Sequence, residues 1–336
     1  MNAYFRPLVQ TGPARPDDAL PLAGGACWFT HVEALRRDGP SEIRPASTLG
    51  DDMRARLTAL RRPICGLSMD TPRLMGILNV TPDSFSDGGA FDGFAPALRH
   101  ALGMAEAGAD ILDIGGESTR PGAREIPVAV EIARTEPVIR AVASQITTPI
   151  SIDTRKETVA RAAHAAGAAL VNDVAGLTFD PLLAPFCAAQ GLPVCIMHAQ
   201  GDPETMQDDP RYDDVLLDVY DWLSDRVGAL EGLGIPRARI IVDPGIGFGK
   251  ALEHNLALLN GISLFHGLGC PILLGASRKG FIGRLGRAPE AADRAPGSIA
   301  VALAAVAQGV QILRVHDVSE TAQALSLWRA VTQGQP

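Results

Sequence analysis

Residues 75–89 read MGILNVTPDSFSDGG. The apolar run at 74–80 is long enough for one buried strand and too short for a helix. Pro82 cannot continue a strand ladder, and the serines, aspartates and glycines after it predict a polar loop. A simple turn is the alternative for the Asp-Gly-Gly sequence. A buried strand that ends in amide, hydroxyl and carboxylate groups is typical of the ligand-binding edge of parallel α/β folds.

The pattern of an apolar strand followed by a helix then repeats along residues 74–331. Strands are expected at 74–80, 111–114, 150–152, 170–174, 194–197, 240–242, 272–274 and 312–315. Helices are expected at 94–107, 128–145, 155–166, 181–190, 211–231, 253–265, 293–308 and 318–331. Eight such units predict an α/β fold of the (β/α)8 TIM barrel type. A doubly wound open sheet is the alternative, but its GxGxxG turn after the first strand is absent.

Residues 1–73 differ from the rest because they carry scattered prolines and no repeating unit. A helix is expected at 49–60, with Ser47 or Thr48 as its cap, and a second one around 29–37. We interpret 1–73 as an N-terminal accessory extension that covers one end of the main domain. The barrel domain, residues 74–336, is then the catalytic one.

Composition and charge exclude several classes of partner. The net charge is −8 and no lysine or arginine run occurs, so nucleic acid and anionic membranes are poor candidates. No apolar run approaches the roughly 18 residues of a membrane span, and the N-terminus lacks the basic-then-apolar profile of a secretory signal. The five cysteines show no CxxC spacing and are expected to be free thiols. These features favour a cytoplasmic protein.

Polar or ionisable side chains follow every expected strand. They are Asn79, Glu117 to Arg120, Asp153 to Arg155, Asn172 and Asp173, His198, Asp243, Ser277 to Lys279, and Arg314, His316 and Asp317. Helix capping is an alternative role for Asp153 and Asp317. Eight such strand ends together predict one pocket for a polar, partly anionic ligand.

These groups fall into three chemical sets. The cationic set, suited to an anion such as pyrophosphate, is Arg120, Arg278, Lys279, Arg314 and His316. The acceptor set, suited to a heterocycle rich in N–H donors, is Asp153, Asn172 and Asp243. Asn79 and Asp83 offer oxygens for Mg²⁺. The glycine-rich DPGIGFGK at 243–250 is not a Walker loop, and its Phe248 offers an aromatic wall.

With these residues in view, the sequence closely resembles the dihydropteroate synthase family. The resemblance spans about 74–331. It is carried by MGILNVTPDSFSDGG (75–89), DIGGESTRPGA (113–123), SIDTRK (151–156), NDVAG (172–176), DPGIGFGK (243–250), GASRKGFIG (275–283) and RVHDV (314–318). It implies a transferase of folate biosynthesis that joins 6-hydroxymethyl-7,8-dihydropterin pyrophosphate to p-aminobenzoate, releasing pyrophosphate and 7,8-dihydropteroate. Gly280 departs from the family, in which many members have serine after the lysine.

The resemblance also implies residue roles. The pterin would be bound by Asp153, Asn172, Asp243 and Lys279, and the pyrophosphate by Thr119, Arg120, Arg314 and His316. Phe85, Pro121, Phe248 and Lys279 would form the p-aminobenzoate pocket, and Asn79 would bind Mg²⁺. The catalytic set would be Asn79, Lys279, Arg314 and His316. No strong general base is expected, because an aryl amine is neutral at pH 7. A homodimer is implied as well.

Two rival functions use the same barrel. A pterin-dependent methyltransferase module would share the pterin residues but has no use for a pyrophosphate clamp. A non-catalytic pterin-binding paralogue would be expected to have lost some of the polar strand ends. The intact set of polar residues therefore favours the synthase.

Overall fold

Eight parallel strands form the central sheet of the computed structural model, which describes residues 3–81, 93–118, 122–201 and 205–334. Neighbouring strands follow the order β11-β10-β9-β8-β7-β6-β13-β12. Their bounds are β6 Arg73–Asn79, β7 Ile111–Gly115, β8 Ile150–Asp153, β9 Leu170–Asp173, β10 Val194–Met197, β11 Ile240–Asp243, β12 Leu273–Leu274 and β13 Ile312–Val315. Each of the eight expected strands is confirmed to within one residue at either end.

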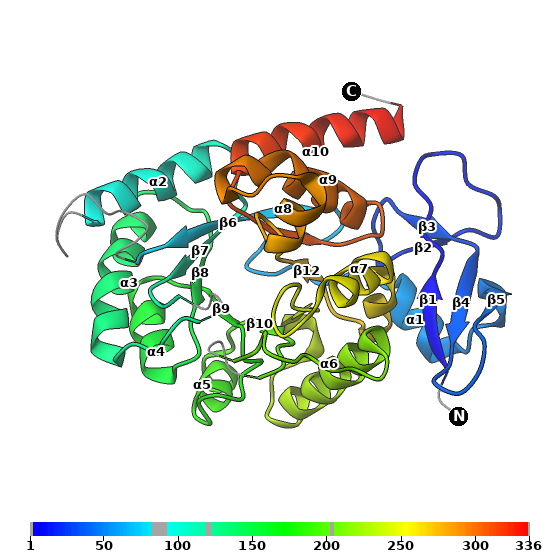
Figure 1. Cartoon of the computed structure of the whole chain (residues 1–336), viewed down its shortest axis with the longest axis horizontal. Coiled ribbons are helices and arrows are strands. Elements are labelled where there is room, and N and C mark those ends of the chain that lie inside the picture. The colour runs from blue at the N-terminus through cyan, green and yellow to red at the C-terminus, as the bar shows by residue number, and fades with distance from the viewer. Residues whose placement is uncertain (1–2, 82–92, 119–121, 202–204, 335–336) are drawn as a thin grey trace.

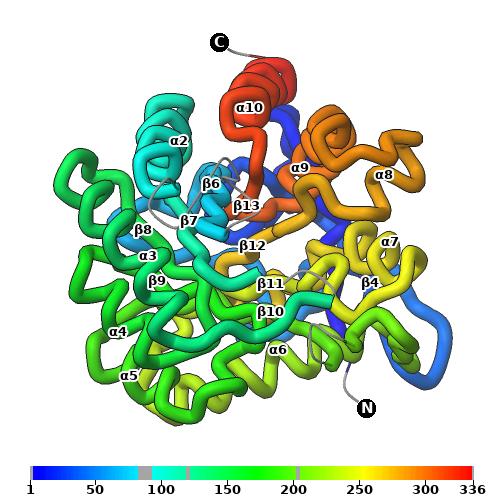
Figure 2. Tube along the Cα trace, turned by 60° about the vertical axis from the view of Figure 1, so that its left-hand side comes forward, coloured from blue at the N-terminus to red at the C-terminus, as the bar shows by residue number. Residues whose placement is uncertain are grey.

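The two edge strands of this sheet meet and complete a ring. Val242 of β11 forms a parallel bridge with Ile272, immediately before β12. The Val242 N–H also donates to the Pro271 carbonyl at 3.0 Å. Figure 2 shows the helices standing around the strands. The fold is therefore the expected (β/α)8 barrel and not an open sheet.

Helices alternate with the strands along the chain. They are α2 Phe94–Glu106, α3 Val128–Ala143, α4 Glu157–Ala166, α5 Leu183–Gln190, α6 Val215–Gly232, α7 Leu252–Asn260, α8 Gly280–Gly286, α9 Ala295–Val306 and α10 Val318–Gln333, with 3₁₀ helices η3 Arg237–Arg239, η4 Ile262–Leu268 and η5 Ala291–Arg294. Of these α-helices, the pattern predicts all but the short α8; the 3₁₀ helix η3 was not predicted either. Gly167 ends α4 with φ of 123°, and a Cβ atom there would lie 2.7 Å from the Ala143 Cβ. Glycine therefore allows α3 and α4 to pack closely. Among the described residues, no helix is long and apolar enough to cross a membrane.

Residues before the barrel form two small sheets and one helix. The elements are β1 Tyr4–Pro7, β2 Leu20–Pro21, β3 Trp28–Phe29, β4 His31–Leu35, β5 Glu42–Pro45, η1 Ala46–Thr48 and α1 Asp51–Thr58. The helix expected around 29–37 is wrong. Val32 and Ala34 are buried and alternate with more exposed neighbours, which is the period-two pattern of a strand. The helix expected at 49–60 is confirmed, but Gly50 precedes it and no side chain caps it.

This N-terminal segment contacts the outside of the barrel through polar groups. The Tyr4 hydroxyl donates to Asp221 at 2.8 Å, and Arg37 lies 2.7 Å from Asp218. The Ser263 hydroxyl donates to the Pro7 carbonyl at 3.0 Å. Figure 1 shows the segment at one end of the molecule, on the side of α6 and α7.

The end of the segment also fills the N-terminal mouth of the barrel. Ile64 and Met69 are buried there, with 1% and 2% of their surface exposed. They share one apolar cluster with strand residues that face the barrel interior: Met75, Ile111, Leu170, Cys195, Ile241, Leu273 and Ile312. Apolar side chains therefore fill the barrel interior at this end.

Candidate active site

Side chains inside the barrel change from apolar to polar along the strand direction. Because side chains alternate across a strand, residues two positions after the apolar cluster face the same interior. These residues include Asp113 of β7, Asn172 of β9, Asp243 of β11 and Arg314 of β13, and Asp153 ends β8. The sequence pattern thus places charge at the C-terminal ends of the strands.

Arg314 is the central cation of this layer. Its Nε donates to Asp113 Oδ2 at 2.6 Å, and its Nη2 donates to Asp153 Oδ2 at 2.7 Å. Burial alone would lower the pKa of Arg314, but the two carboxylates outweigh it and raise the pKa. Burial raises the pKa of Asp153 and Arg314 opposes that shift. Arg314 therefore stays charged and joins β13 to β7 and β8.

Asp243 and Arg314 lie on either side of Gly275. A Cβ atom at Gly275 would be 3.5 Å from Asp243 Oδ2 and 3.9 Å from Arg314 Cδ. Asp243 Oδ1 accepts a hydrogen bond from the Gly245 N–H at 2.7 Å. Burial raises the pKa of Asp243, whereas this hydrogen bond and the nearby Lys279 oppose the rise. The second Asp243 oxygen faces the space beside Arg314.

Lys279 extends across the loop at 243–250. Its Nζ lies 3.8 Å from the centre of the Phe248 ring, a cation–π contact. Burial lowers the pKa of Lys279, and attraction to Asp243 opposes this shift. Gly247 has φ of +81°, and a Cβ atom there would lie 2.9 Å from Lys279 Cδ. The glycine therefore leaves room for the lysine stem beside Phe248.

A buried lysine supports the same loop from below. Lys250 Nζ lies 2.9 Å from His198 Nδ1 and donates to the carbonyls of Phe248 at 2.9 Å and His198 at 3.2 Å. Burial, and then the charge of Lys250, lower the pKa of His198 to about 3. His198 is therefore neutral and accepts a hydrogen bond from the ammonium group. Its ring packs edge-on against Trp222.

Two other strand ends supply His316 and Arg278. His316 Nδ1 lies 3.0 Å from the Ser277 hydroxyl, next to Arg314 along β13. Arg278, expected among the anion-binding cations, donates Nε to Asp317 at 3.1 Å. The Asp317 side chain makes this ion pair and does not cap α10.

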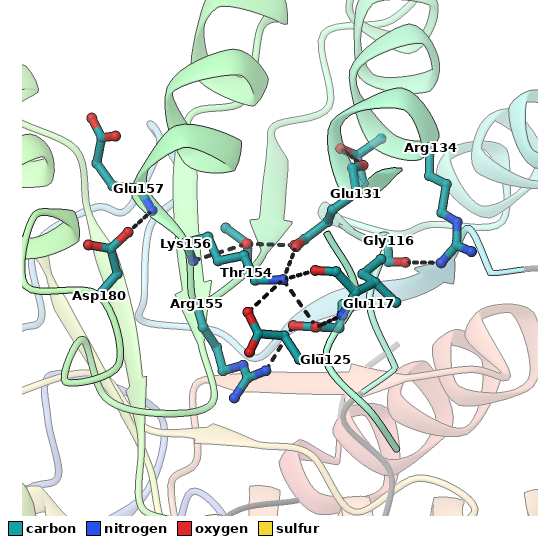
Figure 3. Close-up of polar contacts among 12 residues, drawn as sticks. Gly116, Glu117, Glu125, Glu131, Arg134, Thr154, Arg155, Lys156, Glu157 and Asp180 are labelled. Carbon is teal, nitrogen blue, oxygen red and sulfur yellow. Dashed lines mark hydrogen bonds and ion pairs between the residues drawn. The ribbon is translucent and has the colours of Figure 1, made fainter. Parts of the chain in front are cut away.

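A second set of buried charges surrounds Lys156, three residues after the end of β8, and Figure 3 shows its polar contacts. Lys156 Nζ lies 3.1 Å from Glu117, 3.0 Å from Glu131 and 2.7 Å from the Ile126 carbonyl. The Thr154 hydroxyl donates to Glu131 at 2.6 Å. Glu117 and Ile126 flank the segment that contains residues 119–121, so one ammonium group joins both sides of that loop to β8.

Several expected site residues lie outside the described residues. They are Asp83, Phe85, Thr119, Arg120 and Pro121. Asn79, the candidate metal ligand, ends β6 and pairs with Gly115 of β7. The described residues contain no group of three or more His, Cys, Asp or Glu side chains placed to hold a metal. One amide oxygen suits only an Mg²⁺ ion that keeps waters and takes substrate phosphate oxygens.

The structure brings Asp153, Asn172, Asp243, Lys279 and Arg314 to one end of the barrel. Attraction to Asp243 and Asp153 opposes the lowering of the Lys279 pKa by burial, and repulsion from Arg314 adds to it. Sequence reasoning missed Asp113, because it lies inside the apolar run ILDIG and not at a strand end. The sequence signal that could have identified Asp113 is a carboxylate at an inward-facing position of a buried strand.

The chain matches the family described as pterin binding enzyme over residues 75–316. It is 46% identical over 264 residues to the dihydropteroate synthase of Escherichia coli K12, covering 79% of this chain and 93% of that protein. Identity is 47% over 270 residues to the dihydropteroate synthase of Neisseria meningitidis serogroup B, covering 79% and 94%.

Solved structures agree with these matches. The Xanthomonas albilineans dihydropteroate synthase with 4-aminobenzoic acid is 47% identical, with a TM-score of 0.75 and coverage of 79% of this chain and 94% of that one. The same enzyme in complex with 7,8-dihydropteroate is 44% identical, with a TM-score of 0.72 and coverage of 79% and 95%.

Proposed function

Because this chain belongs to the pterin binding enzyme family, as a dihydropteroate synthase, we propose how its own residues divide the work of that reaction. The enzyme is a transferase of folate biosynthesis. It condenses 6-hydroxymethyl-7,8-dihydropterin pyrophosphate with p-aminobenzoate to give 7,8-dihydropteroate and pyrophosphate. The observation that carries the proposed roles is the meeting of Asp243, Lys279 and Arg314 at one end of the barrel.

The pterin is bound by Asp153, Asn172, Asp243 and Lys279. A carboxylate accepts two hydrogen bonds from adjacent N–H groups, so Asp243 suits the 2-amino and N3–H edge of a pterin. Burial of Asp243, 5% exposed, supports this role because an exposed carboxylate would be solvated by water instead. Lys279 offers a donor to a ring oxygen or nitrogen.

The pyrophosphate is bound by Arg314 and His316, with Thr119 and Arg120 added on the resemblance to the family. Arg314 is 20% exposed at its side chain and supplies positive charge within β13, and His316 follows directly after that strand. Asn79 would hold an Mg²⁺ ion that also takes phosphate oxygens, and the ion would neutralise charge on the leaving group.

The p-aminobenzoate ring is held by Phe248 and the stem of Lys279, with Phe85 and Pro121 added by resemblance. The cation–π contact of 3.8 Å between Lys279 and Phe248 supports an aromatic slot at this point. The backbone N–H groups at the start of α8, next to Gly280, would take the benzoate carboxylate.

In the reaction the C–O bond to pyrophosphate breaks first, and its electron pair leaves with the pyrophosphate. The p-aminobenzoate nitrogen then attacks the pterin methylene carbon and loses a proton to solvent. Negative charge grows on the departing group, so the fixed cation Arg314, with hydrogen-bond donors from Lys279 and His316, supplies most of the stabilisation. No residue has to act as a strong base.

One assay tests these assignments against their rivals. Pyrophosphate release by the purified chain should require both the pterin pyrophosphate and p-aminobenzoate. A pterin-dependent methyltransferase module or a non-catalytic paralogue would release none. Replacement of Arg314 by alanine should abolish release but spare binding of 6-hydroxymethylpterin, which lacks the pyrophosphate.

Assembly, location and domain division are further proposals. A homodimer through the outer barrel helices is supported by exposed apolar side chains on α8 and α10: Leu285, Leu327 and Val331, exposed by 54%, 62% and 81%. Light scattering should report a dimer, and Val331→Glu should weaken it. A cytoplasmic location would be tested by cell fractionation. The family match begins at residue 75, which supports the division into 1–73 and 74–336.

A further inference from the structure

Asp113 lies inside β7 and has no exposed surface. Its Oδ2 atom accepts hydrogen bonds from Arg314 Nε at 2.6 Å and from Asn172 Nδ2 at 3.0 Å. We propose that Asp113 is a positioning residue, which fixes the orientation of Asn172 and Arg314 before substrate binds. This inference rests on the proposed roles of those two residues.

The first consequence concerns the amide of Asn172. A carboxylate can only accept hydrogen bonds, so the Asn172 nitrogen must turn toward Asp113. The amide oxygen lies on the other side of the same carbon and therefore faces away from Asp113. Asn172 thus presents an acceptor to a ligand that offers an N–H group, and the opposite orientation is excluded.

The second consequence concerns the guanidinium plane of Arg314. Asp113 holds Nε from β7, and Asp153 holds Nη2 from β8 at 2.7 Å. Two fixed points define the plane of the group and leave the arginine few alternative rotamers. Because the Arg314 side chain is already ordered, binding of the anion does not have to include the entropy cost of ordering it.

The hydrogen bonding of Asp113 itself argues against a purely structural role. Within the described part of the chain, its Oδ1 atom is buried and has no hydrogen-bond partner. A buried acceptor without a partner is destabilising, and well-packed apolar residues often stabilise such a position better than an ion pair. Asp113 is therefore a poor choice for stabilising the fold alone. Its Oδ2 atom does, however, fix the orientation of both Asn172 and Arg314.

Three variants separate the possibilities. Asp113→Ala removes both hydrogen bonds. Asp113→Asn can keep an oxygen in the place of Oδ2, removes the charge, and puts an amide NH2 group in the place of the unpartnered Oδ1. Ser151→Ala is the matched control, because Ser151 is register-paired with Asp113 on β8, is fully buried, and its hydroxyl lacks a hydrogen-bond partner among the described residues. Each variant is compared for 6-hydroxymethylpterin affinity by calorimetry, for kcat/KM, and for thermal unfolding.

We expect Asp113→Ala to weaken pterin binding by about 30-fold and to lower kcat/KM by about 100-fold, because both neighbours lose a fixed orientation. Asp113→Asn should stay within about fivefold of the wild type, and Ser151→Ala within about twofold. If Asp113→Ala does not fold, Asp113→Asn still decides the matter with Ser151→Ala as its control, since a loss of more than about fivefold in Asp113→Asn, with Ser151→Ala near the wild type, contradicts the proposal.

Two further results would overturn the positioning role. One is an Asp113→Ala protein that folds and keeps pterin affinity and kcat/KM within fivefold of the wild type. The other is an Asp113→Asn protein as impaired as Asp113→Ala, because charge rather than hydrogen bonding would then matter. Failure of the wild-type chain to bind pterin would instead contradict the proposed function, so the two failures are distinguishable.

Discussion

Lys250 and His198 form a buried pair at the base of the active-site loop, with Nζ and Nδ1 2.9 Å apart. Only 3% of Lys250 and 6% of His198 are exposed. Burial lowers the pKa of Lys250 to about 7. Attraction to Asp243 opposes this shift, and repulsion from Lys279 adds to it. Lys250 therefore binds its proton more weakly in the folded chain than in the unfolded chain.

This pair predicts a specific pH dependence of stability. An unfolded lysine keeps its proton up to about pH 10.4, so above about pH 7 the unfolded chain binds more protons. The free energy of unfolding should then rise between about pH 7 and pH 9, by up to about 1.4 kcal/mol per unit from this group. Lys250→Met should lack this contribution. Urea unfolding of both proteins across the range checks it, and parallel curves would contradict it.

The ammonium group of Lys156 should be a large source of stability. It lies within 3.1 Å of both Glu117 and Glu131, and only 5% of its side chain is exposed. Lys156→Met leaves the buried carboxylate of Glu131 without its cation, while Glu117 keeps Arg155 at 3.0 Å, and should cost about 3–5 kcal/mol of unfolding free energy. Glu125→Gln is the control, because Glu125 is 56% exposed and 3.6 Å from Lys156, and should change stability by less than about 1 kcal/mol. Equal effects of both changes in urea unfolding would refute the buried network.

Gly247 should be needed for the p-aminobenzoate slot. A Cβ atom there would lie 2.9 Å from Lys279 Cδ and would displace the lysine from Phe248. Gly247→Ala should raise the KM for p-aminobenzoate by about tenfold. Gly228→Ala, in α6 with no atom within 4 Å of the new methyl group, should leave the KM unchanged and stabilise the helix by about 0.5–1 kcal/mol. An unchanged KM in Gly247→Ala would show that the lysine stem is not part of the slot.

The N-terminal segment should stabilise the barrel through the residues that fill its closed end. Ile64→Ala removes a side chain that is 1% exposed and should cost about 2–5 kcal/mol. Ile43→Ala, on an edge strand and 65% exposed, should cost less than about 0.5 kcal/mol. Denaturant unfolding compares them, and a small cost for Ile64→Ala would mean that the segment only lies against the barrel.

The fold could be predicted because its signals are local. Each barrel strand is a short apolar run with a polar residue after it, and these runs coincide with β6 to β13. The helix expected around 29–37 is wrong because the segment is short, and only the burial of Val32 and Ala34 identifies the strand period. One partner, β1, lies more than 20 residues earlier in the chain, and the other, β5, is a four-residue strand with little apolar signal of its own.

The site was predictable only at the strand ends. Asp243, Lys279 and Arg314 follow the rule that ligands bind at the C-terminal edge of parallel strands. Asp113 was missed because its role depends on Arg314, 201 residues away along the chain. The ion pair of Arg278 with Asp317 was not predictable either, because the sequence neighbours of Arg278 do not reveal that partner.

The assignment of the pterin site to the polar end of the barrel is tested most directly by p-aminobenzoate-dependent pyrophosphate release. Asp243→Asn keeps the size of the side chain but removes a two-point acceptor, and should lower kcat/KM at least about 100-fold. Asp110→Asn alters a carboxylate at the opposite end of the barrel, 3.2 Å from Arg73, and should stay within about twofold of the wild type. Wild-type turnover by Asp243→Asn would contradict the assignment.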